Sequence, residues 1–165
     1  MSFILLVEQV LNGIQSGVML FLMAAGLTLI FGVMGLINLA HGSLYMVGAF
    51  AAAAVAAATG SFLLALVAAL AAAALAGCLI EMTVIRRLYD RDHLDQVLAT
   101  FALILIFSEG TRFFFGSFPL FLDMPDAVAG PVTLPGGIQY PLYRLVIIGV
   151  GLAIAAGLFL LIART

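Results

Sequence analysis

The sequence predicts an all-α fold, a polytopic transmembrane helical bundle of about five spans with a short β-hairpin in one connection. Of the 165 residues, 65% are hydrophobic and only 8% are charged, whereas soluble domains carry about 25% charged residues. The stretch from Gln9 to Ile80 contains no Asp, Glu, Lys or Arg. Because one crossing needs about 20 apolar residues, this stretch alone has room for about three spans.

The spans follow from apolar runs long enough to cross a membrane. We interpret residues 1–165 as one membrane-embedded domain in which a short lead, residues 1–12, precedes the first span. All five prolines lie in residues 116–141, so a break inside a span has to come from glycine and polar residues. The expected spans are residues 13–36, 42–59, 62–85, 94–115 and 142–163.

The second and third spans are rich in alanine. Alanine is small and favours helix, so we expect these two helices to pack tightly against neighbours. Gly60 and Ser61 supply the turn between them. In the fourth span, Glu109 and Arg112 stand one turn apart and are expected to form an ion pair.

The distribution of arginine predicts which connections face the cytoplasm. Three of the six Lys and Arg residues, namely Arg86, Arg87 and Arg91, lie in the connection after the third span, and the positive-inside rule places that connection in the cytoplasm. The connection of residues 116–141 has no Lys or Arg and is expected outside. The orientation of the N-terminus stays open, because residues 37–43 are compatible with a re-entrant segment.

The outer connection contains a hairpin pattern. Val132–Leu134 and Ile138–Tyr140 flank the turn sequence Pro135–Gly137, which predicts a small β-hairpin. Such a rigid, proline-rich loop is either part of a docking surface for a partner protein or an ordinary structured connector.

Several classes of function are disfavoured. The net charge is −2 and the chain has no Lys, so we expect no nucleic-acid partner. No Walker A, HExxH, CxxC or serine-nucleophile motif is present, and we expect no catalytic residue, metal site or cofactor. The single cysteine, Cys78, lies in an apolar run and is interpreted as a packing residue.

The stretch Gly26–Phe50 carries the strongest functional signal. It places Asn38, His41 and Ser43 in an apolar region, where polar groups are costly unless they are paired, hydrated or facing a cavity. One interpretation is a translocation path; the other is polar contact between helices. For the path we also expect apolar walls from Leu36 and Leu39. The full set of candidate substrate-path residues is Asn38, His41, Ser43, Gly35, Gly42 and Tyr45.

This stretch, GLTLIFGVMGLINLAHGSLYMVGAF, resembles the hallmark of bacterial branched-chain amino acid ABC importer permeases. Glu81 with Arg86 and Arg87 looks like the exit of the family's third span, and His93–Thr100 resembles the entry to its next span. The resemblance covers most of residues 10–116. The matching positions in the hallmark are Gly26, Gly32, Ile37, Asn38, Ala40, His41, Gly42, Met46 and Gly48.

The resemblance implies a set of partners and a location. Such a permease pairs with a homologous second permease subunit in the bacterial inner membrane and contacts membrane lipid. Two cytoplasmic ABC ATPase subunits use the ATP, so the permease is not itself an enzyme, and a periplasmic substrate-binding protein delivers the cargo. Leucine, isoleucine and valine are the usual substrates, while other relatives carry urea, short amides or other amino acids.

The resemblance also covers the end of the sequence. Arg164 and Thr165 are similar to the opening of the family's cytoplasmic coupling segment, so we expect them at the ATPase-coupling edge of what looks like the N-terminal half of a permease. Two other classes stay open. One is a small ATP-independent transporter or channel, for which the spans offer no carboxylate that would couple an ion; the other is an assembly subunit without a transport role.

Overall fold

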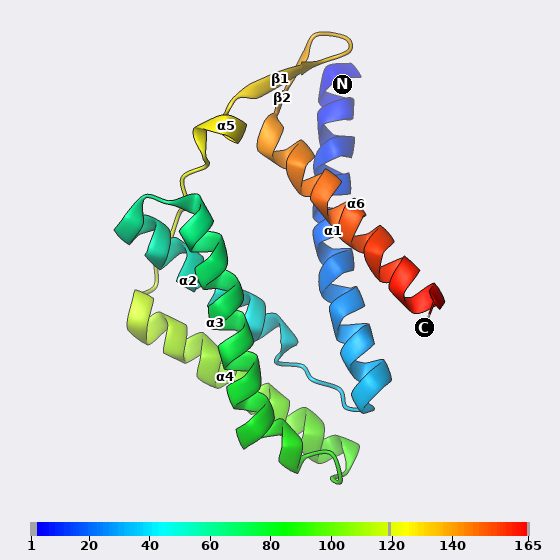
Figure 1. Cartoon of the computed structure of the whole chain (residues 1–165), viewed down its shortest axis with the longest axis vertical. Coiled ribbons are helices and arrows are strands. Elements are labelled where there is room, and N and C mark those ends of the chain that lie inside the picture. The colour runs from blue at the N-terminus through cyan, green and yellow to red at the C-terminus, as the bar shows by residue number, and fades with distance from the viewer. Residues whose placement is uncertain (1–2, 119, 165) are drawn as a thin grey trace. The chain divides into compact units, whose positions relative to one another are not determined.

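A computed structural model describes residues 3–118 and 120–164 (Figure 1). The chain divides into two compact units. One unit contains the residues up to Gly26 together with those from Met124 onward, and the other contains Leu27–Asp123. Each unit has its own packing and is described separately.

Five helices in the described part of the chain are long and apolar enough to cross a membrane, which confirms the predicted bundle. Large apolar side chains remain exposed along all of them, as expected for surfaces that face lipid or another membrane subunit. The five helices are α1 (Phe3–Met34), α2 (His41–Thr59), α3 (Phe62–Thr83), α4 (His93–Phe115) and α6 (Leu142–Arg164).

The first helix differs from its prediction at both ends. The described residues of the proposed lead are part of the same helix as the first span, because α1 already begins at Phe3 and has no proline to interrupt it. Its 32 residues correspond to a length of about 48 Å, which exceeds the ~30 Å hydrocarbon thickness and requires tilt or protrusion. The helix ends at Met34 because Gly35 adopts the left-handed conformation, φ 65°, while its N–H still bonds to Phe31 O at 2.8 Å.

In the unit of residues 27–123, α2 and α3 form a helical hairpin and α4 packs against α2 (Figure 1). The turn is the predicted one. Gly60 is left-handed, with φ 65°, and its N–H bonds to Ala56 O at 2.8 Å. The Ser61 hydroxyl accepts a hydrogen bond from Leu64 N at 3.4 Å and so caps the start of α3.

The alanine-rich faces of α2 and α3 pack closely, as expected. A Cβ added at Gly48 would lie 3.2 Å from the backbone oxygen of Ala69 and 3.6 Å from Cβ of Ala73, so the two backbones approach where Gly48 has no side chain. The buried core of this unit lies where the link after α1 meets the end of α3 and the middle of α4. It consists of Leu36, Ala40, Ile80, Ile85 and Leu103.

The connection after α3 is a compact structure. The helix ends at Thr83, two residues before the predicted end of the span, and one turn of 3₁₀ helix, η1 (Ile85–Arg87), follows. Buried Gln96 of α4 donates from Nε2 to the carbonyl oxygens of Leu88 and Arg91, both at 3.1 Å. One amide side chain therefore holds two turns of this connection.

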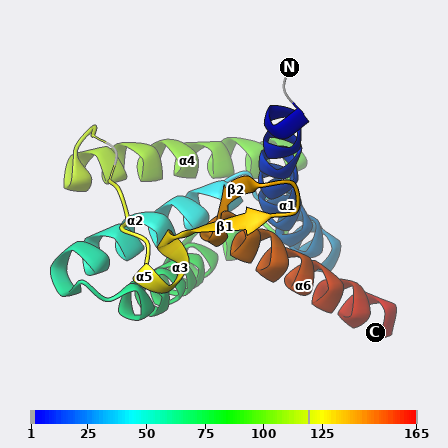
Figure 2. The same cartoon turned by 90° about the horizontal axis from the view of Figure 1, so that it is seen from above.

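In the other unit, the predicted hairpin is confirmed as β1 (Pro131–Leu134) paired antiparallel with β2 (Ile138–Pro141), just ahead of α6 (Figure 2). Gly136 and Gly137 have φ of 94° and 77°, which the turn requires. Buried Tyr140 donates its hydroxyl to Asn12 Oδ1 of α1 at 3.0 Å. A one-turn helix, α5 (Asp126–Ala129), was not predicted.

Candidate functional site

The link between α1 and α2 is the polar break that the sequence predicts. Buried Asn38 accepts a hydrogen bond from Ala40 N at its side-chain Oδ1, 3.0 Å away, and its carbonyl oxygen accepts from His41 N at 3.2 Å. Asn38 thus forms an Asx turn that leads into α2. The break is produced by left-handed Gly35 and this turn, without proline, as predicted.

The other candidate residues lie in different surroundings. Ser43 is buried, and His41 is half-buried with a buried Nδ1 that has no hydrogen-bond partner in the described part of the chain. Gly35 and Gly42 are open, since no heavy atom lies within 4 Å of an added Cβ at either. Tyr45 is exposed on α2.

One cavity of about 230 Å³ lies in the unit of residues 27–123, between the end of α1, the link, the start of α2 and the end of α3. Of the six candidates only Asn38 lines it, together with Leu36, one of the two leucines that we expected to form apolar walls. The remaining lining residues are Ile30, Met34, Leu44, Gly77, Cys78, Ile80, Glu81 and Ile85.

Glu81 is the charged residue of this cavity. Its side-chain Oε1 accepts a hydrogen bond from the Tyr89 hydroxyl at 2.5 Å, and that hydroxyl also lies 3.5 Å from Sδ of Met34. The hydrogen bond to Glu81, with burial as a second cause, raises the pKa of Tyr89 above its ordinary value, because only the protonated phenol can donate this bond.

The sequence analysis did not single out Glu81 as a candidate site residue. This residue lies in the last turn of α3, inside a helix apolar enough to cross a membrane. A signal was present: Glu81 is the first charged residue after the long uncharged stretch and falls within the expected third span. The sequence cannot show that the link after α1 folds against it.

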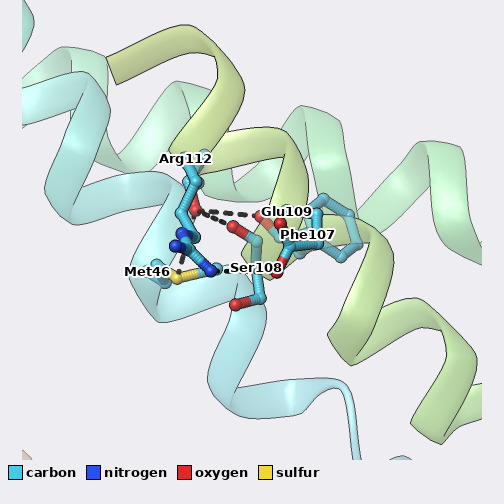
Figure 3. Close-up of polar contacts among 6 residues, drawn as sticks. Met46, Phe107, Ser108, Glu109 and Arg112 are labelled. Carbon is cyan, nitrogen blue, oxygen red and sulfur yellow. Dashed lines mark hydrogen bonds and ion pairs between the residues drawn. The ribbon is translucent and has the colours of Figure 1, made fainter. Parts of the chain in front are cut away.

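The predicted pair of Glu109 and Arg112 is confirmed, with Arg112 Nη1 3.3 Å from Glu109 Oε1 on α4 (Figure 3). Both side chains are exposed, and such pairs contribute about 0–1 kcal/mol, which indicates a surface feature and not a site. Beside this pair, Thr111 Oγ1 lies 3.7 Å from Met46 Sδ of α2.

The two residues expected at the ATPase-coupling edge are the last two of the sequence. Arg164 ends α6 and is exposed, and Thr165 lies outside the described residues.

Five long apolar helices, interrupted by a link with buried polar groups and a cavity beside it, define a multi-pass membrane protein. A family model for the branched-chain amino acid transport system permease component matches residues 9–117. This range covers more than half of the chain and includes the link, the cavity and α4. The chain therefore belongs to the branched-chain amino acid transport permease family.

Relatives with curated functions agree over a shorter stretch. The high-affinity branched-chain amino acid transport system permease proteins LivH of Escherichia coli (strain K12) and of Salmonella typhimurium are each 39% identical over 49 residues, which is 30% of this chain and 16% of the relative. BraD of Pseudomonas aeruginosa is 42% identical over 45 residues, 27% of this chain and 15% of BraD. The matched stretch thus spans less than a fifth of these relatives. No solved structure matches the chain.

Proposed function

We propose that this chain is a transmembrane permease subunit of an ATP-driven importer for the branched-chain amino acids leucine, isoleucine and valine. The observation that carries the proposal is the family match over residues 9–117, because it includes both the polar break and the cavity. The chain is a transport subunit and not an enzyme. It needs no cofactor of its own, and the ATP is used by cytoplasmic ABC ATPase subunits.

The proposed setting is the bacterial inner membrane, with a homologous second permease subunit beside this one. The exposed apolar surfaces of the five helices support contact with such a subunit and with lipid. A periplasmic binding protein is the proposed source of substrate, and the hairpin of β1 and β2 is a candidate part of its docking surface. Its anchoring through Tyr140 and Asn12 supports a rigid surface that loses little entropy on binding.

The cavity lining favours this substrate class over the alternatives. Leu36, Leu44 and Ile80 present hydrocarbon walls, which suit a branched aliphatic side chain. Urea and short amides are largely polar and gain little from such walls. For the same reason we place other, more polar amino acids second.

Uptake and assembly test the proposal together. The gene is expressed with its flanking genes in cells that lack their own branched-chain uptake system, and entry of radiolabelled leucine is measured with excess isoleucine, valine or urea as competitor. We expect ATP-dependent uptake that isoleucine and valine suppress and urea does not, and co-purification of the tagged chain with an ABC ATPase. Uptake without an ATPase would instead support an ATP-independent transporter. Assembly without any uptake would support a structural subunit.

Substitution of Asn38 by alanine separates the path interpretation from the packing interpretation. If Asn38 lies on the path, Asn38→Ala lowers leucine uptake about tenfold or more, the equivalent of about 1.4 kcal/mol, while membrane abundance and co-purification of the ATPase stay normal. Asn38→Asp keeps an acceptor for Ala40 N–H and controls for loss of the turn. Unchanged uptake in Asn38→Ala would contradict the path interpretation.

A further inference from the structure

We propose that the cavity of residues 27–123 is a binding site for small molecules that combine a cationic amine with an apolar body, and that the Glu81 carboxylate is the partner of the amine. That the natural ligand is the α-ammonium group of a branched-chain amino acid rests on the proposed function. The preference of the cavity for an apolar amine does not depend on the proposed function.

The first argument is the unbalanced charge of Glu81. Its side chain is half-buried and lines a cavity whose other polar side chain, apart from the weakly polar Cys78, is Asn38. In the described part of the chain the only ion pair is that of Glu109 and Arg112, so Glu81 has no cationic partner there. A carboxylate in an apolar setting is costly unless it is paired, and a bound ammonium group supplies the missing charge.

The second argument is the hydrogen-bonding capacity that Glu81 retains. An ionised carboxylate accepts through both oxygens, and the Tyr89 hydroxyl bonds to Oε1 at 2.5 Å. Tyr89 orients the carboxylate from the connection after α3, and Oε2 has no donor among the residues that the structure describes. An ammonium group, with three N–H donors, matches the acceptor capacity of a carboxylate better than a neutral hydroxyl does.

The third argument is size and lining. The cavity of about 230 Å³ is smaller than the ~300–1,000 Å³ pockets that hold drug-sized ligands, so it suits a smaller molecule. Its walls are mainly aliphatic, with Leu36, Leu44 and Ile80 among them. Such walls accept a branched hydrocarbon group next to the charged end.

The position of the cavity along the spans indicates the step of transport at which this site would bind cargo. Glu81 lies two residues before the end of α3, and the connection that follows contains Arg86, Arg87 and Arg91. By the positive-inside rule this connection faces the cytoplasm, so the cavity lies at the cytoplasmic end of the spans. We therefore assign it to the exit side, where cargo dwells before release.

The reactivity of the Cys78 thiol can be used to probe the charge of the cavity. It is the single cysteine of the chain, it is exposed, and it lines the cavity. It also lies three residues before Glu81 on α3, and residues at this spacing are neighbours on a helix surface. The rate at which charged reagents modify Cys78 should therefore depend on the charge of Glu81.

The experiment uses the complete transporter in inside-out membrane vesicles, with modification of this subunit followed by mass spectrometry. Relative to their rates with free cysteine, cationic aminoethyl methanethiosulfonate is expected to modify Cys78 about tenfold faster than the anionic sulfonatoethyl reagent. Glu81→Gln abolishes this preference, whereas Glu109→Gln, which alters an exposed carboxylate on α4, leaves it intact. Equal rates for both reagents in the unmodified protein, or reactivity confined to right-side-out vesicles, would overturn the assignment.

Ligand protection tests the apolar amine directly. Isoamylamine and leucine should slow the modification of Cys78, and isocaproate, which has the same hydrocarbon chain without the amine, should not. Gly77→Leu fills the cavity beside Leu44 and should remove protection, while Gly110→Leu, at an open position of α4, should retain it. Protection by isocaproate equal to that by isoamylamine would refute recognition of the amine.

The two proposals fail in different ways. If Glu81→Gln does not accumulate in the membrane, Glu81→Asp keeps the charge and must still show the preference for the cationic reagent. If isoamylamine protects Cys78 but the transporter does not take up leucine, the cavity site is supported and the proposed function is rejected. Leucine uptake without protection of Cys78 would reject the cavity site alone.

Discussion

Replacing Gly48 by leucine is expected to weaken the packing of α2 on α3 by about 1–3 kcal/mol, the usual cost of overpacking a filled interior. The first added atom alone would lie 3.2 Å from the backbone oxygen of Ala69 and 3.6 Å from Cβ of Ala73. A backbone oxygen inside a helix cannot rotate away as a flexible side chain does. The remaining atoms of leucine would therefore force the helices apart.

Thermal denaturation of the purified protein in detergent, followed by loss of the monodisperse peak in size-exclusion chromatography, measures this effect. The matched control is Gly110→Leu, where an added Cβ has no heavy atom within 4 Å. There the replacement of a helical glycine should be neutral or stabilising by up to about 1 kcal/mol. Equal stability of the two variants would show that the backbones of α2 and α3 do not meet at Gly48.

The helices were predictable because their signal is local. An apolar run of sufficient length defines a span without knowledge of its neighbours, so α2, α3, α4 and α6 begin and end within two residues of expectation. The start of α1 was missed because the polar residues Glu8, Gln9 and Asn12 were interpreted as an interfacial lead. A long helix tolerates such residues when it extends beyond the hydrocarbon layer.

The candidate site was only partly predictable, for a different reason. Asn38 stood out because a polar residue in an apolar stretch is costly. The cavity, by contrast, depends on which turn of α3 faces the link after α1, and the alanine-rich faces leave many such registers equally acceptable. Glu81, held by the Tyr89 hydroxyl, joins Asn38 in the lining of the cavity only because of that tertiary arrangement.

Replacing Gln96 by leucine is expected to release the connection between α3 and α4. Gln96 is buried, and its Nε2 is shared by the carbonyl oxygens of Leu88 and Arg91 at 3.1 Å each. Leucine has similar bulk but no donor, so both hydrogen bonds are lost, and each such bond contributes about 0.5–1.5 kcal/mol. Each 1 kcal/mol of lost stability raises the population of the open connection about fivefold.

The rate of trypsin cleavage measures how often this connection opens. Trypsin cuts after arginine, and the connection carries the exposed residues Arg86, Arg87 and Arg91. In inside-out vesicles, Gln96→Leu should be cleaved in this connection about fivefold faster than the unmodified protein, since cleavage of a rapidly opening segment follows the open population. Gln9→Leu, a change at an exposed position of α1, should not alter the rate. Cleavage in right-side-out vesicles instead would reverse the proposed orientation.

Gln96→Glu distinguishes the hydrogen bonds from the packing of this side chain. A glutamate has nearly the same shape as glutamine, but its ionised carboxylate accepts and cannot donate, so it should behave like Gln96→Leu. If both variants resist trypsin, the connection is held by its apolar residues, Ile85 in the core of this unit and Leu88 packed against that core. If both open, Tyr89 moves with the connection and loses its bond to Glu81. The Glu81 carboxylate would then lose its orientation toward the cavity, and the preference of Cys78 for the cationic reagent should weaken as well.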